Sequence, residues 1–194
     1  MNVSNGSNMK KIMFNDKYGL TEAVLSGVKT QTRRVMDEVL TLVVHDDNMK
    51  NILPEMGRYR TGEVVAIAQA YRDLKASRDF FTDAIFLNEY VSTAGWENKM
   101  FVMANKMQHH IRITNVKLKR LQDISDEDCL KEGILGFGMT DPMNPSIGIY
   151  KFSGANRLYS TPREAFAVLI DQTCGKGTWG KNPYVFVYDF KLEK

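Results

Sequence analysis

Hydrophobic residues occur in short runs separated by polar and glycine-rich stretches, a pattern typical of short strands. The unbroken apolar run Val64–Ala68 follows the turn signal Gly62-Glu63 and predicts a strand buried on both faces. Residues 111–118 alternate between apolar and polar, but the parity changes near Thr114-Asn115, as a β-bulge in a curled strand would produce. Residues 184–190 also alternate, which predicts a closing strand with one aromatic face.

Three short helices are predicted among these strands. Residues 21–26 have the apolar content of a short helix, which Gly27 would end. Ser125, followed by three acidic residues, predicts the start of a second helix that ends near Gly133. Thr161-Pro162-Arg163-Glu164 combines a hydroxyl cap, an early proline and a glutamate three residues later, so a third helix should begin there. Short curved strands with few helices predict an α+β barrel and argue against a βαβ nucleotide-binding fold.

Neither repeats nor shifts in composition mark a boundary between domains. We therefore expect one domain over residues 11–194, preceded by a polar, flexible leader of residues 1–10. In residues 72–106 and 135–160, hydrophobic residues do not recur at the spacing of a helix or a strand. The second segment is also rich in glycine and proline. Both are interpreted as insertions within the single domain.

Composition narrows the function classes only slightly. The 194 residues are 43% hydrophobic and 25% charged, which is ordinary for a globular domain, and a net charge of +3 permits an RNA or nucleotide partner without requiring one. Cys129 and Cys174 form no CxxC pair, so a disulfide framework is not supported, and a reduced, cytoplasmic setting fits best. Apolar runs long enough to cross a bilayer are missing, so we expect no membrane partner.

The basic segment Gly27-Val28-Lys29-Thr30-Gln31-Thr32-Arg33-Arg34 follows the first predicted helix. Its pattern, G-x-K-T-x-T-x-R, resembles the opening of ASCH-domain proteins, a family of small PUA-like β-barrels. Three later blocks resemble the family in the same order. Arg60-Thr61-Gly62-Glu63-Val64 resembles the family's entry into a strand, and residues 118–134 and 179–187 resemble its phage-related branch. The resemblance covers nearly the whole chain and implies a small curved PUA-like barrel with about three short helices, whose cleft faces RNA or a nucleotide-like ligand.

A branch of very small bacterial ASCH proteins has catalytic residues that are similar to residues of this chain. Those proteins are amidohydrolases that remove the acyl group from acetylated cytidine with a lysine, a threonine and a glutamate. The resemblance places these three roles on Lys29, Thr32 and Glu132. The chain departs from those minimal enzymes in carrying the two insertions.

Amide hydrolysis needs a nucleophile, a base and a proton donor for the leaving amine. Thr32 can supply the hydroxyl and Lys29 the base, provided that burial and the neighbouring charges of Arg33 and Arg34 lower the pKa of the lysine. Glu132 would orient the lysine or protonate the leaving group. In a regular strand Lys29 and Thr32 would point to opposite faces, so this mechanism requires a turn or bulge within residues 29–32.

The residues predicted to bind the ligand are Thr30, Gln31, Arg33, Arg34, Trp179 and Tyr184. For the basic segment the alternative is a solvated charged edge. For the two aromatic residues the choice is between stacking on a base and packing in the core. Glu132 can equally be an ordinary surface residue of its helix.

Two further patterns are set aside. Residues 175–181 fit the G-x-x-x-x-G-K part of a phosphate-binding loop, but Asn182 stands where that loop has serine or threonine, and the segment leads from a helix into a strand. His109 and His110 are adjacent without a third ligand, so we expect no metal and no cofactor. The sequence therefore predicts an RNA- or nucleoside-binding domain, with an acetylcytidine-type amidohydrolase and a ribonuclease as alternatives.

Overall fold

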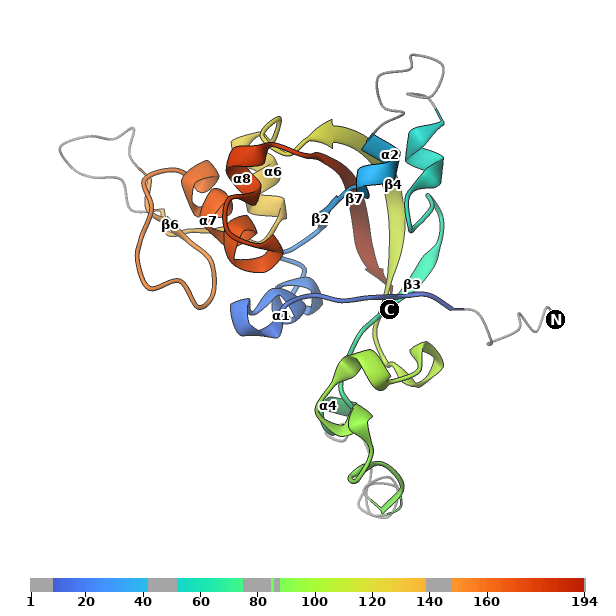
Figure 1. Ribbon diagram of the computed structural model, residues 1–194. Coiled ribbons are helices and arrows are strands. Elements are labelled where there is room, and N and C mark those ends of the chain that lie inside the picture. Colours follow the sequence, from blue (N-terminus) through green and yellow to red (C-terminus); the bar gives the residue numbers. More distant parts are fainter. Residues whose placement is uncertain (1–8, 42–51, 75–84, 86–87, 139–147, 194) are drawn as a thin grey trace. The chain divides into compact units, whose positions relative to one another are not determined.

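Figure 1 shows a computed structural model that describes residues 9–41, 52–74, 85, 88–138 and 148–193. The chain is a mixed α+β structure with a mostly open sheet and few helices. It divides into two compact units: unit 1 is Met1–Phe14, Val64–Arg112 and Leu192–Lys194, and unit 2 is Asn15–Glu63 and Ile113–Lys191. Most of the predicted leader lies outside the described residues. In the described part of the chain, no helix is both long and apolar enough to cross a membrane.

Unit 1 contains β1 (Lys11–Ile12), β3 (Val64–Ile67) and the first residues of β4 (His110–Arg120). β1 runs parallel to β3, and β3 pairs antiparallel with β4 so that Val65 lies opposite Ile111. Val65, Ala66 and Ile67 are fully buried, as the apolar run predicted.

Among the described residues of unit 1, short helical turns include α4 (Tyr71–Leu74) and the 3-10 helices η4 (Ala94–Trp96), η5 (Lys99–Phe101) and η6 (Ala104–Lys106). Tyr71 stacks on Tyr90 with ring centroids 4.1 Å apart, within a buried cluster that includes Leu74 and Val102. Residues 75–84 and 86–87 of the predicted insertion lie outside the described residues.

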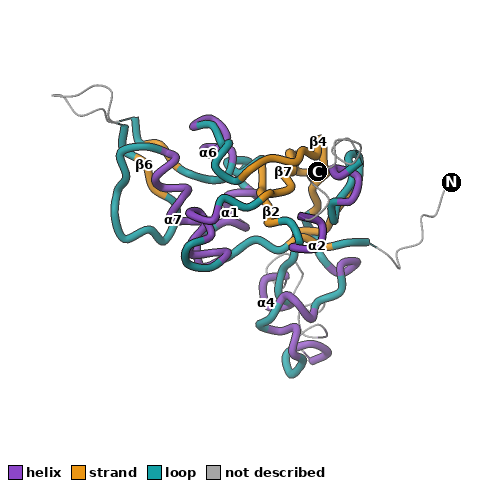
Figure 2. Tube along the Cα trace, turned by 45° about the horizontal axis from the view of Figure 1, so that its top comes forward, coloured by secondary structure: helices purple, strands orange, loops and turns teal. Residues whose placement is uncertain are grey.

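Unit 2 contains most of β4, together with β7 (Tyr184–Glu193) and β2 (Gln31–Val35). These strands lie next to one another in the order β4-β7-β2, drawn in orange in Figure 2. β2 pairs antiparallel with β7, which places Thr32 opposite Tyr188. The helices that the structure describes in this unit are η1 (Asp16–Tyr18), α1 (Leu20–Leu25), α2 (Glu38–Thr41), η2 (Leu53–Met56), α6 (Asp126–Lys131), α7 (Pro162–Cys174) and α8 (Thr178–Lys181).

The three predicted helices are found as α1, α6 and α7, and the last two begin at the predicted caps. The Ser125 hydroxyl accepts a hydrogen bond from the Asp128 amide at 3.1 Å, and the Thr161 hydroxyl accepts one from the Glu164 amide at 3.1 Å. In the second predicted insertion, β5 (Leu135–Gly136) and β6 (Tyr150–Lys151) form a small antiparallel pair. Residues 139–147 lie outside the described residues. α6 packs on β2 and on α7, and α7 packs on α8, which brings the acidic end of α6 to the basic segment.

Candidate functional site

Lys29 and Glu132, 103 positions apart, form a buried ion pair. The Lys29 Nζ lies 2.6 Å from a carboxylate oxygen of Glu132 and 2.8 Å from its carbonyl oxygen. The side chains are only 3% and 5% exposed. The backbone holds this arrangement, because the amide of Lys29 donates to the Ala23 carbonyl at the end of α1 and the amide of Thr30 donates to the Lys131 carbonyl of α6.

Arg33 binds the same carboxylate from the strand. One guanidinium nitrogen lies 3.0 Å from the other oxygen of Glu132 and also donates to the Gln31 amide oxygen, while the second lies 3.0 Å from Asp128. The Arg33 side chain is 1% exposed. We call Lys29, Gln31, Arg33, Asp128 and Glu132 the buried cluster. Its two positive and two negative charges balance, as the low-dielectric interior requires.

Strand periodicity explains which side chains join the buried cluster. Successive residues of a strand point to opposite faces, so Gln31 and Arg33 share one face of β2 while Thr32 and Arg34 project from the other. Residues 31–35 form a strand in register with β7, and the ladder continues through a hydrogen bond from the Phe190 amide to the Thr30 carbonyl. The structure thus joins Lys29 to Glu132 and places Thr32 on the face of β2 opposite the cluster.

Burial and the Glu132 charge shift the pKa of Lys29 in opposite directions. Desolvation is the largest effect and lowers the pKa of Lys29, the Glu132 carboxylate raises it, and the charges of Arg34 and Arg33 lower it further. The net result is a pKa below the usual value for lysine. A lysine of this kind gives up its proton more readily, as a general base must.

A second polar contact ties the buried cluster to β7. The Gln31 side-chain amide donates to Asp189 at 2.6 Å, and the same carboxylate accepts from Asn115 at 3.3 Å and from Lys117 at 3.1 Å. Burial acts to raise the pKa of Asp189, but these hydrogen bonds and the Lys117 charge outweigh it and hold that pKa below its usual value.

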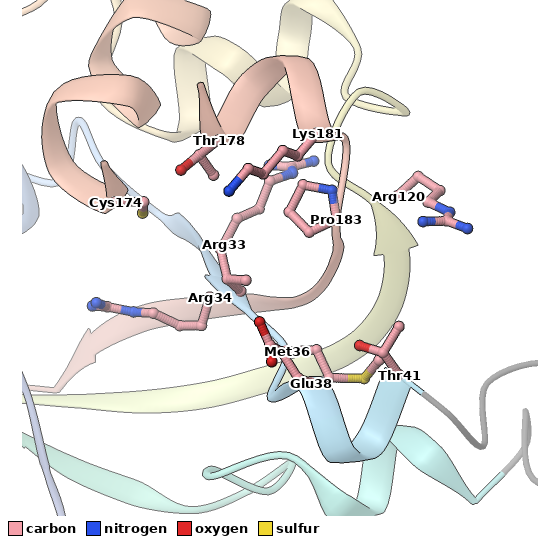
Figure 3. Close-up of a pocket in the computed structure, with 11 residues that line it drawn as sticks. Arg33, Arg34, Met36, Glu38, Thr41, Arg120, Cys174, Thr178, Lys181 and Pro183 are labelled. Carbon is pink, nitrogen blue, oxygen red and sulfur yellow. The ribbon is translucent and has the colours of Figure 1, made fainter. Parts of the chain in front are cut away.

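A pocket of about 560 Å³ lies beside the basic segment (Figure 3). This volume lies within the range of small-molecule binding sites. Arg33 and Arg34 line it from β2, Lys181 lines it from α8, and Cys174 lines it at the end of α7. None of Lys29, Thr32 and Glu132 lines this pocket, so the cationic pocket and the predicted catalytic residues are separate features of unit 2.

The two predicted stacking residues already have neighbours in the protein. The guanidinium of Arg120 lies over the Tyr184 ring at 3.7 Å, and that of Arg163 lies 5.0 Å from the Trp179 ring, whose edge-to-face partner is Phe166. Both predicted residues are half-buried. Each is therefore a cation–π partner within the fold, and Arg120, next to Tyr184, also lines the pocket.

The segment that resembles a phosphate-binding loop uses its amides internally. Asp171 on α7 accepts hydrogen bonds from the amides of Gly177 at 3.1 Å and Trp179 at 2.8 Å, at the start of α8. A phosphate would have to displace this carboxylate to reach those amides. The segment is not a simple turn as predicted, because its last four residues form α8, and Lys181 at the end of that helix lines the pocket.

Sequence reasoning did not find Lys181, Thr178 or Cys174 as pocket residues. For Lys181, the available signal was its position at the end of the glycine-rich segment 175–181. Across the residues that the structure describes, no three His, Cys, Asp or Glu side chains are grouped so as to hold a metal ion. No family model, curated protein or solved structure matches this chain.

Proposed function

We propose that this chain is an ASCH-like domain with a PUA-like barrel that binds RNA or a nucleoside through its Lys29–Arg34 segment. The observation that carries the proposal is the pocket beside Arg33 and Arg34. Its lining includes four basic residues and one acidic residue, Glu38. Such an excess of positive charge beside an apolar surface favours a ligand that carries both phosphate and a base.

Fluorescence anisotropy with labelled single-stranded RNA tests this function. We expect binding that weakens as salt increases, because phosphate contacts release counterions. Arg34→Ala should weaken binding by about tenfold, whereas Lys176→Ala, which removes an exposed charge from the turn before α8 but not from the pocket, should leave it unchanged. If neither RNA nor the four nucleosides bind at low salt, the proposal is wrong.

The amidohydrolase is a second candidate because the Lys29 amine lies 2.6 Å from Glu132 and has a lowered pKa. In this reaction the Thr32 oxygen would attack the acyl carbonyl, Lys29 would take the hydroxyl proton, and the amine of cytidine would leave with a proton. Water would then release the acyl group as a carboxylic acid. The Thr32 hydroxyl would have to reach Lys29 from the other face of β2, so this candidate requires a rearrangement of residues 29–32.

Chromatography of acetylated cytidine after incubation with the protein tests this second candidate. Deacetylation by the wild-type chain that a folded Lys29→Ala variant lacks would support it. Glu127→Gln, which alters an exposed carboxylate on the same helix as Asp128, serves as the control. If the wild-type chain releases no cytidine, the candidate is eliminated for this substrate.

A further inference from the structure

The pocket beside the basic segment has an apolar side and a cationic side. Val35, Met36 and Pro183 supply apolar surface, and Lys181, Thr178 and Arg34 supply polar groups. In Figure 3 the end of the Lys181 side chain is directed toward Thr178, on the side of the pocket where Arg34 and Cys174 also lie. An apolar surface next to two cations suits a ligand with a flat uncharged part and an anionic part.

The four basic side chains of the pocket do not contribute equally to its charge. Arg33 is held by Asp128 and Glu132, which together offset its charge. Arg120 lies over Tyr184, donates to the Asn182 carbonyl at 3.2 Å and is directed away from the other labelled cations in Figure 3. Lys181 and Arg34 are the basic residues that lie with Cys174 on one side of the pocket in Figure 3.

Backbone amides are not the groups that would hold an anion here. The Asp171 carboxylate already accepts the hydrogen bonds of Gly177 and Trp179 at the start of α8. An anion in the pocket would meet side-chain cations instead, and ammonium and guanidinium groups form the strongest hydrogen bonds to phosphate.

We propose that this pocket binds a phosphorylated nucleoside, with the phosphate contacted by Lys181 and Arg34 and the base packed against Val35, Met36 and Pro183. This inference rests on the proposed function and narrows it. A pocket of about 560 Å³ holds one nucleotide and not a duplex. The ligand is then a free nucleotide or the phosphorylated end of an RNA strand, and a nucleoside without phosphate binds much more weakly.

Cys174 gives a direct readout of occupancy because it lines the same pocket and is exposed. The other cysteine of the chain, Cys129, is fully buried. Alkylation of the native protein by iodoacetamide, followed by mass spectrometry, therefore reports on Cys174. We expect a mixture of the four ribonucleoside 5′-monophosphates to slow this alkylation, and the four nucleosides to need concentrations about tenfold higher or more for the same protection.

Paired variants and paired RNAs make the test specific. Lys181→Ala should abolish protection by the nucleotides, whereas Lys176→Ala, which removes an equal charge outside the pocket, should preserve it. If an RNA with a 5′-phosphate protects Cys174 and the same RNA with a 5′-hydroxyl does not, the ligand is the phosphorylated end of a strand. Protection by mononucleotides alone identifies a free nucleotide.

Several results would overturn the proposal. If nucleosides protect Cys174 as well as nucleotides do, the phosphate makes no contact in the pocket. If inorganic phosphate protects it as well, the base makes none. If Lys181→Ala and Lys176→Ala lose protection equally, Lys181 is not part of the site. RNA binding in the anisotropy assay with an unchanged alkylation rate at Cys174 would refute this pocket while leaving the proposed function intact. The absence of both binding and protection would refute the two together.

Discussion

The ion pair between Lys29 and Glu132 makes a sharp prediction for Glu132→Gln. The substitution preserves the size and backbone of the residue and removes its charge. In the wild-type chain that carboxylate lies 2.6 Å from the Lys29 amine and 3.0 Å from the Arg33 guanidinium. The variant leaves two buried cations with Asp128 as the remaining carboxylate of the buried cluster.

The expected loss of stability follows from burial. Removing one partner of a buried ion pair typically costs about 3–5 kcal/mol, because the other charge stays desolvated without compensation. A glutamine oxygen can still accept one hydrogen bond, so we expect the lower end, about 3 kcal/mol. For a chain of this size, that corresponds to a decrease in Tm of about 6–12 °C.

The loss should also depend on pH. The folded-state pKa of Lys29 lies below its unfolded value of 10.5, so between the two the unfolded chain binds more protons and the free energy of unfolding rises with pH. Removal of the Glu132 charge lowers the folded-state pKa further and widens this interval toward lower pH. The loss of stability in the variant should therefore shrink as the pH is raised toward 10.5.

Urea unfolding followed by circular dichroism measures both effects. Glu127→Gln is the matched control, because it makes the same change on α6 in a side chain that is 77% exposed and pairs with Lys131 at the surface. That control should unfold close to the wild type, since exposed ion pairs contribute little. A Glu132→Gln variant within about 1 kcal/mol of the wild type, or a loss that stays constant with pH, would refute a tightly coupled buried pair.

Three further predictions concern other parts of unit 2. Cys174 should react with thiol reagents in the native protein, whereas Cys129 should stay unmodified until the chain unfolds, because burial raises the pKa of Cys129 to about 12. Equal alkylation rates of the two cysteines, measured by mass spectrometry, would contradict this. Asp171→Ala should lower the free energy of unfolding by about 1–2 kcal/mol, since two amides at the start of α8 lose their acceptor; an unchanged urea midpoint would contradict it. Gly57→Ala should cost about 1–3 kcal/mol, because the added Cβ would lie 2.7 Å from the hydroxyl of the buried Tyr188; unchanged thermal unfolding would show that the ring can move.

Local signals in the sequence were sufficient for α1, α6 and α7 of unit 2. The caps at Ser125 and Thr161 act within three residues of the chain, so their chemistry can be read without knowledge of the fold. The buried strand β3 was equally predictable, because the side chains of an uninterrupted apolar run leave water only where both faces of the strand are covered. By contrast, nothing local distinguishes Asp171 from any other helix residue, and its role appears only when α8 folds back onto it.

Local sequence signals were not sufficient to predict the arrangement of the candidate site. Resemblance named Lys29 and Glu132, and their contact depends on α6 packing against β2, which no local pattern encodes. Periodicity gave the complementary result: alternation along residues 29–33 puts Thr32 on the face opposite Lys29 unless the strand is broken, and β2 is continuous from Gln31. The buried ion pair of Lys29 and Glu132 joins the basic segment to the end of α6, whereas Lys181 and Arg34 line the pocket. Arg33 takes part in both the buried cluster and the pocket lining, whereas Lys29, Thr32 and Glu132 do not line the pocket, so a binding pocket is a stronger inference than a lysine-dependent reaction.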